Sequence, residues 1–252
     1  MMHRGQHLLD NFETLCSIHA LTVKRYRMVM TKELIALSTE QNEILVVAMA
    51  GRVKVDAKSL NDPVTLGEKD ILYLPPGDKF NLRAVSSPND VILAYAPASH
   101  SYRPYYKRFS ETKVVNAGSD ACRRRVYRMI VEKDPAERFL SGFTEGEQGN
   151  WTTFPPHKHD GNPELYIYYG MGGRFGVQTV ITDEEERAYV VHDGDAVLVE
   201  KGFHSNVATP GTGMNFLWII SADRKAGGLS LEFHPNYRDL QIAPIHLGTE
   251  RC

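Results

Sequence analysis

The alternation of apolar and polar residues predicts short β-strands from residue 42 onward. EILVVAMAGRVKVDA contains two β-rich runs separated by Gly51, and LGEKDILYLPPGDKFNLRA and DVILAYAPA continue the pattern, with Gly and Pro between runs. Runs of this length bounded by turn residues are typical of strands, and long helical periodicity is absent. Residues 1–40 are mixed and predict only short elements. Regularly spaced short strands indicate a sandwich or barrel.

A second series of strand-like runs begins near Arg123, after a polar and aromatic connector at residues 98–118. It includes RRRVYRMIV, GNWTTFPPHKHD, ELYIYYGM, RFGVQTVIT, RAYVVHDGDAVLVEKGFHSNVAT and NFLWIISA. The two series are similar, because LGEKDILYLPPG at Leu66–Gly77 parallels HDGDAVLVEKG at His192–Gly202. An internal repeat of this kind indicates a duplicated barrel.

The repeat predicts an all-β chain with two domains. We expect an N-terminal barrel in residues 1–115 and a C-terminal barrel in residues 116–252. The chain has 252 residues, of which 42% are hydrophobic and 24% are charged, so it can form two small cores. Residues 229–252 show no strong period and are expected to pack across a barrel.

A His-x-His pair in the second series is the first sign of chemistry. His157 and His159 flank Lys158 in a strand-like run, so both imidazoles face one side and the lysine faces the other. A lone strand histidine is more often a surface or hydrogen-bonded core residue, and we interpret His192 in this way. The pair by itself leaves a metal site and a structural role equally open.

Two further residues extend the pair to a possible ligand set. Glu164 opens the run ELYIYY after the turn-rich residues 160–163, and His204 follows the Gly202 turn. A solvated strand end is the alternative for Glu164, but its neighbours are apolar or aromatic. Three neutral imidazoles and a carboxylate suit a divalent metal and leave positions for water or substrate. The sequence therefore predicts a metal site formed by His157, His159, Glu164 and His204.

Charge and composition exclude several classes of function. The net charge of −2 provides no general attraction for nucleic acid or an anionic membrane. We interpret the short basic cluster at residues 123–125 as a solvated face. No apolar run is long enough to span a bilayer, and the start of the chain lacks a signal-peptide core, so we expect a cytoplasmic protein. Cys16, Cys122 and Cys252 are too few and scattered for a disulfide framework, which predicts free thiols.

The ligand pattern resembles the two motifs of the cupin family. In GNWTTFPPHKHDGNPELYIYYG, the residues that match the first motif are Gly149, His157, His159, Glu164 and Gly170. Gly194, Gly202 and His204 resemble the second motif, with Glu200 where a proline is usual. The resemblance implies double-stranded β-helix, or jelly-roll, barrels.

A closer resemblance concerns isomerases of deoxy-uronates. GNWTTFPPHKHD, LYLPPGD and DGDAVLVEKGFH are similar to the 5-deoxy-glucuronate isomerase family of inositol breakdown. The short gap before Glu164 and the run ELYIYYGM are more similar to its sister family, the 4-deoxy-5-keto-uronate isomerases of pectin breakdown. The resemblance covers about residues 40–240. It implies two fused cupin barrels, with the metal in the C-terminal one. The donor set indicates zinc, or else manganese, iron, nickel or cobalt. The N-terminal barrel has neither a His-x-His pair in GRVKV nor a histidine after Gly77, so we expect it to be metal-free.

The resemblance also implies an aldose–ketose isomerase, with 5-deoxy-glucuronate as first candidate substrate and 4-deoxy-5-keto-uronate as the alternative. Such a reaction moves a proton or a hydride between adjacent carbons and develops negative charge on oxygen, which a Lewis acid stabilises. A general base is needed, and a metal-bound hydroxide, Tyr166 and Tyr168 are the candidates. Gln178 is expected to orient the substrate.

An anionic sugar needs a cation for its carboxylate. Arg174 shares a strand face with Gln178, and Arg124 and Arg128 are further candidates, although each can equally be a surface charge. A metal-dependent cupin oxygenase and a non-catalytic sugar-binding bicupin are the rival functions. We expect no nucleic acid or membrane partner, and a homo-oligomer remains open.

Overall fold

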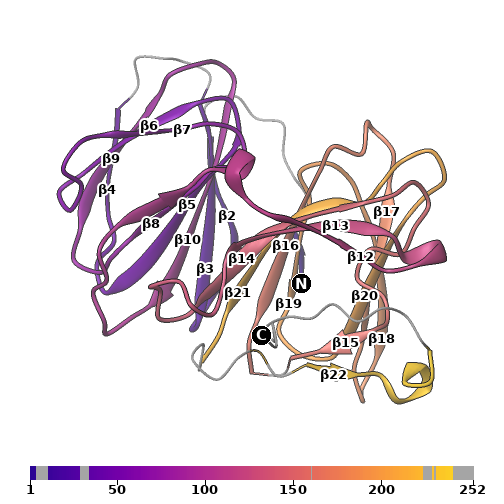
Figure 1. The fold of residues 1–252 in the computed structure, drawn as a ribbon. Helices are drawn as coiled ribbons and strands as arrows, with labels where there is room; N and C mark the ends of the chain where they lie inside the picture. The colour runs from indigo at the N-terminus through magenta and orange to yellow at the C-terminus, as the bar shows by residue number, and fades with distance from the viewer. Residues whose placement is uncertain (4–10, 29–33, 160, 224–228, 230, 241–252) are drawn as a thin grey trace. The chain divides into compact units, whose positions relative to one another are not determined.

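The computed structural model describes residues 1–3, 11–28, 34–159, 161–223, 229 and 231–240. Within them the regular structure is β-strand, apart from the short 3₁₀ helices η1 (Phe109–Glu111), η2 (Asp120–Cys122) and η4 (Pro235–Tyr237). None of the described helices is long and apolar enough to cross a bilayer. The chain divides into two compact units, each containing two β-sheets (Figure 1). The prediction of an all-β protein with two barrels is therefore confirmed.

The two units are not contiguous in the sequence. One, here called the N-terminal unit, comprises His7–Thr112 and Asp134–Arg138. The other, the C-terminal unit, comprises Met1–Gln6, Lys113–Lys133 and Phe139–Cys252. The expected ranges 1–115 and 116–252 thus differ from these units at residues 1–6, 113–115 and 134–138.

The N-terminal unit consists of a six-stranded and a four-stranded sheet. Its strands are β2 (Asn11–Ile18), β3 (Leu21–Met28), β4 (Leu34–Ser38), β5 (Asn42–Ala50), β6 (Val53–Ala57), β7 (Val64–Leu66), β8 (Ile71–Leu74), β9 (Lys79–Ala84), β10 (Asn89–Pro97) and β11 (Tyr105–Lys107). The strand orders are β11-β8-β5-β10-β3-β2 and β4-β9-β6-β7. In β6 the valines and the alanine are buried while Lys54 and Asp56 are exposed, which is the period of two expected for a half-buried strand.

Apolar side chains from both sheets fill the interior of the N-terminal unit. They include Val53, Val55, Leu72, Leu82 and Leu93, which belong to one hydrophobic cluster. Burial of this apolar surface is the main favourable contribution to folding of the unit.

The C-terminal unit consists of a seven-stranded and a five-stranded sheet. Its strands are β1 (Met2–His3), β12 (Val114–Ala117), β13 (Arg124–Ile130), β14 (Phe139–Gly146), β15 (His157–Lys158), β16 (Glu164–Tyr169), β17 (Gly176–Ile181), β18 (Glu186–Val191), β19 (Ala196–Val199), β20 (Phe203–Ala208), β21 (Asn215–Ser221) and β22 (Glu232–Phe233). The strand orders are β1-β19-β16-β21-β14-β13-β12 and β18-β17-β20-β15-β22. The strand β22 places part of the expected packing tail beside β15, and residues 241–252 lie outside the described part of the chain.

The buried tyrosines of the N-terminal unit make its stability sensitive to alkali. The Tyr73 hydroxyl donates a hydrogen bond to Oε2 of the buried Glu43 at 3.1 Å, and its ring stacks on Tyr105 at 5.1 Å between centroids. Burial first, and then the charge of Glu43, raise the pKa of Tyr73 well above its usual range. Burial likewise raises the pKa of Tyr105 and of Tyr95.

These shifts predict loss of stability above about pH 10, where tyrosines of an unfolded chain ionise. The folded unit keeps its phenolic protons there, so the stabilisation is complete below that pH and is lost as the pH rises toward the folded-state values. We expect the urea unfolding midpoint to be unaffected by these groups below about pH 10 and to fall progressively as the pH rises above it. In Tyr73→Phe this fall should be shallower, and an unchanged slope would contradict the assignment.

Candidate active site

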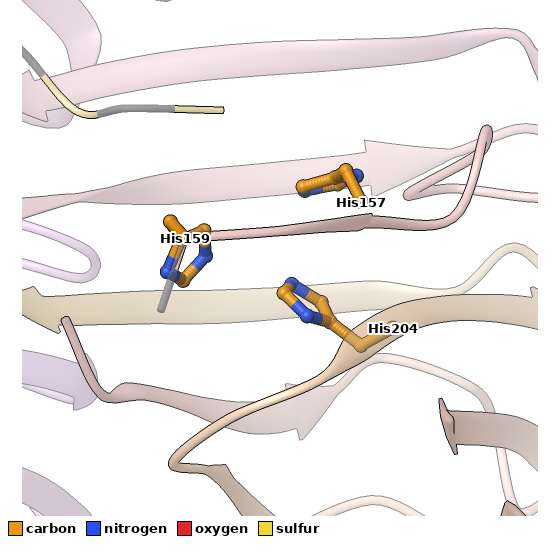
Figure 2. A group of neighbouring side chains, drawn as sticks. All are labelled: His157, His159 and His204. Carbon is orange, nitrogen blue, oxygen red and sulfur yellow. The ribbon is translucent and has the colours of Figure 1, made fainter. Parts of the chain in front are cut away.

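Two paired strands and the start of a third bring the predicted metal ligands together. His157 in β15 lies directly opposite His204 in β20 across an antiparallel ladder. His159 follows β15, and Glu164 is the first residue of β16. All four side chains are buried, at 7% exposure or less. Figure 2 shows the three imidazole rings around one shared space.

The distances are those of a compact ligand cluster. One nitrogen from each of His157, His159 and His204 lies within 4.8 Å of the other two. Glu164 contacts two of these rings, since its Oε2 lies 2.8 Å from Nε2 of His159 and 3.3 Å from Nε2 of His204. The structure thus brings together all four residues of the predicted ligand set.

Backbone carbonyls determine which nitrogen of each ring is available. Nδ1 of His157 lies 2.9 Å from the Pro155 carbonyl oxygen, and Nδ1 of His159 lies 2.9 Å from that of Asn162. Nδ1 of His204 lies 3.2 Å from the carbonyl oxygen of Gly202. A carbonyl oxygen only accepts, so each Nδ1 carries the hydrogen. In a neutral ring the lone pair is then on Nε2, as in histidines that bind metals.

The electrostatics of the cluster favour a cation. Burial first, and then the neighbouring His204, lower the pKa of His157 to about 3, so that ring is neutral at physiological pH. Burial alone would lower the pKa of His159, but the hydrogen bond and charge of Glu164 raise it above its usual value. Burial alone would raise the pKa of Glu164, whereas His159 and His204 hold it well below its usual range. The cluster therefore combines a buried carboxylate with imidazole rings, and both kinds of group favour a cation between them.

These donors fit a divalent metal ion. Nε2 of His204 is buried and, although Glu164 Oε2 lies 3.3 Å away, it has no hydrogen bond of normal geometry among the described residues. Buried polar atoms in proteins are normally satisfied, so an atom like this one marks a site for a ligand or ion. Three imidazole nitrogens with their second nitrogens hydrogen-bonded, together with one carboxylate, suit zinc and related ions.

The cluster opens onto a pocket lined by both polar and apolar side chains. The pocket has an empty volume of about 470 Å³, including the part open to solvent. The polar residues that line it are His157, His159, Glu164, Arg124, Thr152 and Thr153. The apolar residues that line it include Val126, Phe216, Trp218 and Ile220. A small molecule in this pocket therefore contacts the candidate ligands directly.

Residues 6–240 match the model of the KduI/IolB family. The chain belongs to the KduI/IolB family. A protein of Geobacillus kaustophilus called 5-deoxy-glucuronate isomerase is 34% identical over 151 residues, which are 56% of this chain and 54% of that protein. A 4-deoxy-L-threo-5-hexosulose-uronate ketol-isomerase of Opitutus terrae is 28% identical over 189 residues, covering 72% of this chain and 66% of that protein. With the Geobacillus relatives, the matched region spans about half the length of the relative.

Solved structures agree with the cupin fold. An IolB-like protein from Salmonella typhimurium LT2 superposes with a TM-score of 0.83 at 19% identity, covering 94% of this chain and 97% of that one. A mutant oxalate decarboxylase of Bacillus subtilis superposes with a TM-score of 0.64 at 13% identity, covering 85% and 71%. At these identities the similarity concerns the fold alone.

The two units of this KduI/IolB chain differ at equivalent ladder positions. The strand β5 pairs with β8 and β10 as β16 pairs with β19 and β21, and β9 pairs with β4 and β6 as β20 pairs with β15 and β17. Ile44 of the N-terminal unit takes the ladder position of Glu164. Phe80 takes the position of His204, and Leu37, which is paired with Phe80, takes that of His157. All three apolar residues pack in or against the hydrophobic cluster. The space used for ligands in one unit is thus filled by apolar core in the other.

Tyr166, one of the residues expected to act on the substrate, lines the pocket. Its hydroxyl donates a hydrogen bond to Glu164 Oε2 at 2.7 Å. Burial first, and then the charge of Glu164, raise the pKa of Tyr166 well above its usual range.

Tyr168 and Gln178 are not among the described residues that line the pocket. The Tyr168 hydroxyl donates to Gln178 Oε1 at 2.8 Å, and the Asn206 amide donates to the same oxygen at 3.1 Å. The Gln178 amide in turn donates to the carbonyl oxygens of Thr179 and Ser205 at 3.0 and 3.1 Å. The polar groups of Gln178 are therefore used within the protein.

The structure separates the three candidate arginines. Arg174 is exposed in the loop before β17. Arg128 is half-buried and forms an ion pair with Glu132 at 2.8 Å. Arg124 is only 3% exposed and lines the pocket.

The interpretation of residues 123–125 as a solvated face is wrong for Arg124. Arg123 and Arg125 are exposed and lie 3.9 and 3.0 Å from glutamates, but the intervening residue of the strand points to the opposite side. Thr152 and Thr153 were not expected in the site. They lie within GNWTTFPPHKHD, yet nothing in the sequence around them distinguishes them from threonines outside a site.

Proposed function

We propose that this chain is a metal-dependent isomerase that interconverts the aldehyde and ketone forms of a deoxy-hexuronic acid. The observation that carries the proposal is the cluster of three buried imidazoles beside Glu164 on the wall of a pocket. Membership of the KduI/IolB family supports it, because relatives in both named groups are isomerases of deoxy-uronates. The first candidate substrate is 5-deoxy-glucuronate, which would place the chain in inositol breakdown.

We propose His157, His159, Glu164 and His204 as the ligands of the metal and zinc as its identity, with manganese, iron, nickel and cobalt suited to the same donors. A bound divalent ion supplies a Lewis acid for the carbonyl and hydroxyl oxygens of a sugar. The Nδ1 hydrogen bonds to backbone carbonyls hold the three rings in place, so little reorganisation accompanies binding.

Tyr166 is the proposed catalytic residue of the chain. Moving a proton between adjacent carbons also requires protons to be exchanged with the sugar oxygens. The Tyr166 hydroxyl is buried on the pocket wall and donates its hydrogen to Glu164, so it donates to the substrate only when a substrate oxygen replaces Glu164 as the acceptor. We propose that Tyr168 and Gln178 act as positioning residues, since their hydrogen bonds connect β16 to β17 and β20 beneath the site.

Turnover by zinc-loaded protein without oxygen tests the proposal. An isomerisation changes no oxidation state at the metal, so activity on 5-deoxy-glucuronate should persist with redox-inert zinc under anaerobic conditions. The second substrate in the assay is 4-deoxy-5-keto-uronate, because the Opitutus relative aligns with 72% of the chain. Product formation is followed by proton NMR.

The outcomes separate the rival functions. Anaerobic turnover of either sugar supports an isomerase, and the relative kcat/KM identifies its substrate. Failure on both sugars, together with oxygen consumption by the iron form, would replace the isomerase with an oxygenase.

A further inference from the structure

Arg124 is a buried cation without a counterion among the described residues. Its Nη1 donates to the Cys122 carbonyl oxygen at 2.7 Å, and its Nη2 lies 3.4 Å from the Phe154 carbonyl oxygen. Its Nε is buried and has no hydrogen-bond partner in the described part of the chain. A guanidinium has five N–H donors, and these contacts use two of them.

The local fold holds this guanidinium on the pocket side of β13. Arg124 and Val126 line the pocket, as alternate residues of one strand do. Gly118 makes room for it, because a Cβ at this position would lie 2.0 Å from the Cys122 carbonyl oxygen and 2.7 Å from Arg124 Nη1. The φ angle of +78° at Gly118 also disfavours any residue with a side chain.

The charge of Arg124 is maintained at a cost. Burial lowers the pKa of Arg124 to about 10, which still leaves the group protonated at neutral pH. A buried charge with no ion-pair partner destabilises a fold, so it is rarely retained without a role. An anion that enters the pocket would supply the missing partner.

Two threonine hydroxyls that line the same pocket are also without hydrogen-bond partners among the described residues. Oγ1 of Thr152 and Oγ1 of Thr153 are buried and have no hydrogen-bond partners within the described residues. Both threonines line the pocket with Arg124 and the candidate metal ligands. Unsatisfied donors that converge on one pocket indicate a polar ligand with several acceptor oxygens.

We propose that Arg124 binds the carboxylate of the substrate and makes the pocket selective for a sugar acid over the corresponding neutral sugar. A carboxylate matches the fork of a guanidinium and forms strong charge-assisted hydrogen bonds with it. The metal ligands and Arg124 then contact chemically different groups of one molecule. The inference rests on the proposed function for the identity of the sugar, and on the pocket itself for the recognition of an anion.

The test compares 5-deoxy-glucuronate with its carboxamide, which keeps the shape of the acid and removes its charge. Wild-type protein should prefer the acid by about 100-fold in kcat/KM. In Arg124→Met, kcat/KM for the acid should fall by about 100-fold while that for the amide changes little. Arg174→Met is the matched control, because Arg174 is exposed, and it should retain the preference. Metal content should be the same in all three proteins.

A second variant and a second readout keep the inference testable. Arg124→Lys keeps the charge but not the fork, so the preference for the acid should fall by about tenfold even if the methionine variant does not fold. Calorimetric binding of 5-deoxy-glucuronate is measured in parallel because it does not require turnover.

The two proposals fail in different ways. If wild-type protein binds the acid without isomerising it, and the Arg124 variants bind it more weakly, the proposed function fails and the inference stands. If wild-type protein isomerises the acid and both Arg124 variants keep the full preference, the inference is overturned and the function stands. Absence of both binding and turnover in the wild type overturns both.

Discussion

A variant with alanine at both His157 and His159 is expected to lose its divalent metal and its isomerase activity together. Wild-type protein should contain about one ion per chain, as a single four-ligand site implies. The double variant keeps only Glu164 and His204, which are too few to hold the ion through purification. Lewis-acid stabilisation is worth several kcal/mol, so activity should fall at least about a thousandfold. Elemental analysis and the anaerobic assay measure the two losses.

The matched control for this variant is His192→Ala. His192 is half-exposed and its Nδ1 lies 3.6 Å from Asp195, so its loss should leave metal content and activity unchanged. Circular dichroism verifies that both variants are folded. Full metal content in the double variant would show that the ion is bound elsewhere.

Phenylalanine in place of Tyr166 should separate metal binding from proton transfer. The ring would keep its contact with Phe216, whose centroid lies 5.0 Å away, while the hydroxyl beside Glu164 is lost. We expect metal content to be unchanged and kcat to fall by about 100- to 1,000-fold, with a much smaller change in KM. Steady-state kinetics with zinc-loaded protein provide the measurement.

Tyr168→Phe is the control for the hydroxyl. It removes a buried hydrogen bond to Gln178 outside the described pocket wall, so stability should fall by about 1 kcal/mol while kcat changes less than about tenfold. Equal losses of kcat in the two variants would mean that neither hydroxyl acts on the substrate. A Tyr166 variant with wild-type kcat would leave the acid–base group elsewhere in the pocket.

Local alternation is what makes the ligand residues predictable from sequence. A strand directs residues two apart to one side, so His157 and His159 could be assigned a common face without a structure. His204 joins the site because the antiparallel pairing of β15 and β20 places it opposite His157. No local sequence pattern specifies this pairing. The resemblance to cupin motifs supplied that long-range information.

The role of Gln178 shows where sequence reasoning ends. Its position on an inward strand face is consistent with contact to a substrate, and this was the expectation. In the structure its amide bonds to Tyr168, Asn206 and two backbone carbonyls, and these bonds depend on the register of three strands. Arg124 illustrates the converse. A run of three arginines suggests a solvent-exposed surface, but neighbouring residues of a strand face opposite sides, so the middle arginine can be buried.

The non-contiguous units have a consequence for the order of events as the chain leaves the ribosome. The buried Glu43 accepts hydrogen bonds from the backbone N–H groups of Glu137 and Arg138, so the N-terminal unit is incomplete until residue 138 has been made. The strand β1 stays unpaired for longer, because its partner β19 begins at residue 196. During synthesis the first strand of the chain therefore remains unpaired while most of the protein forms behind it. Such long-range closures slow folding.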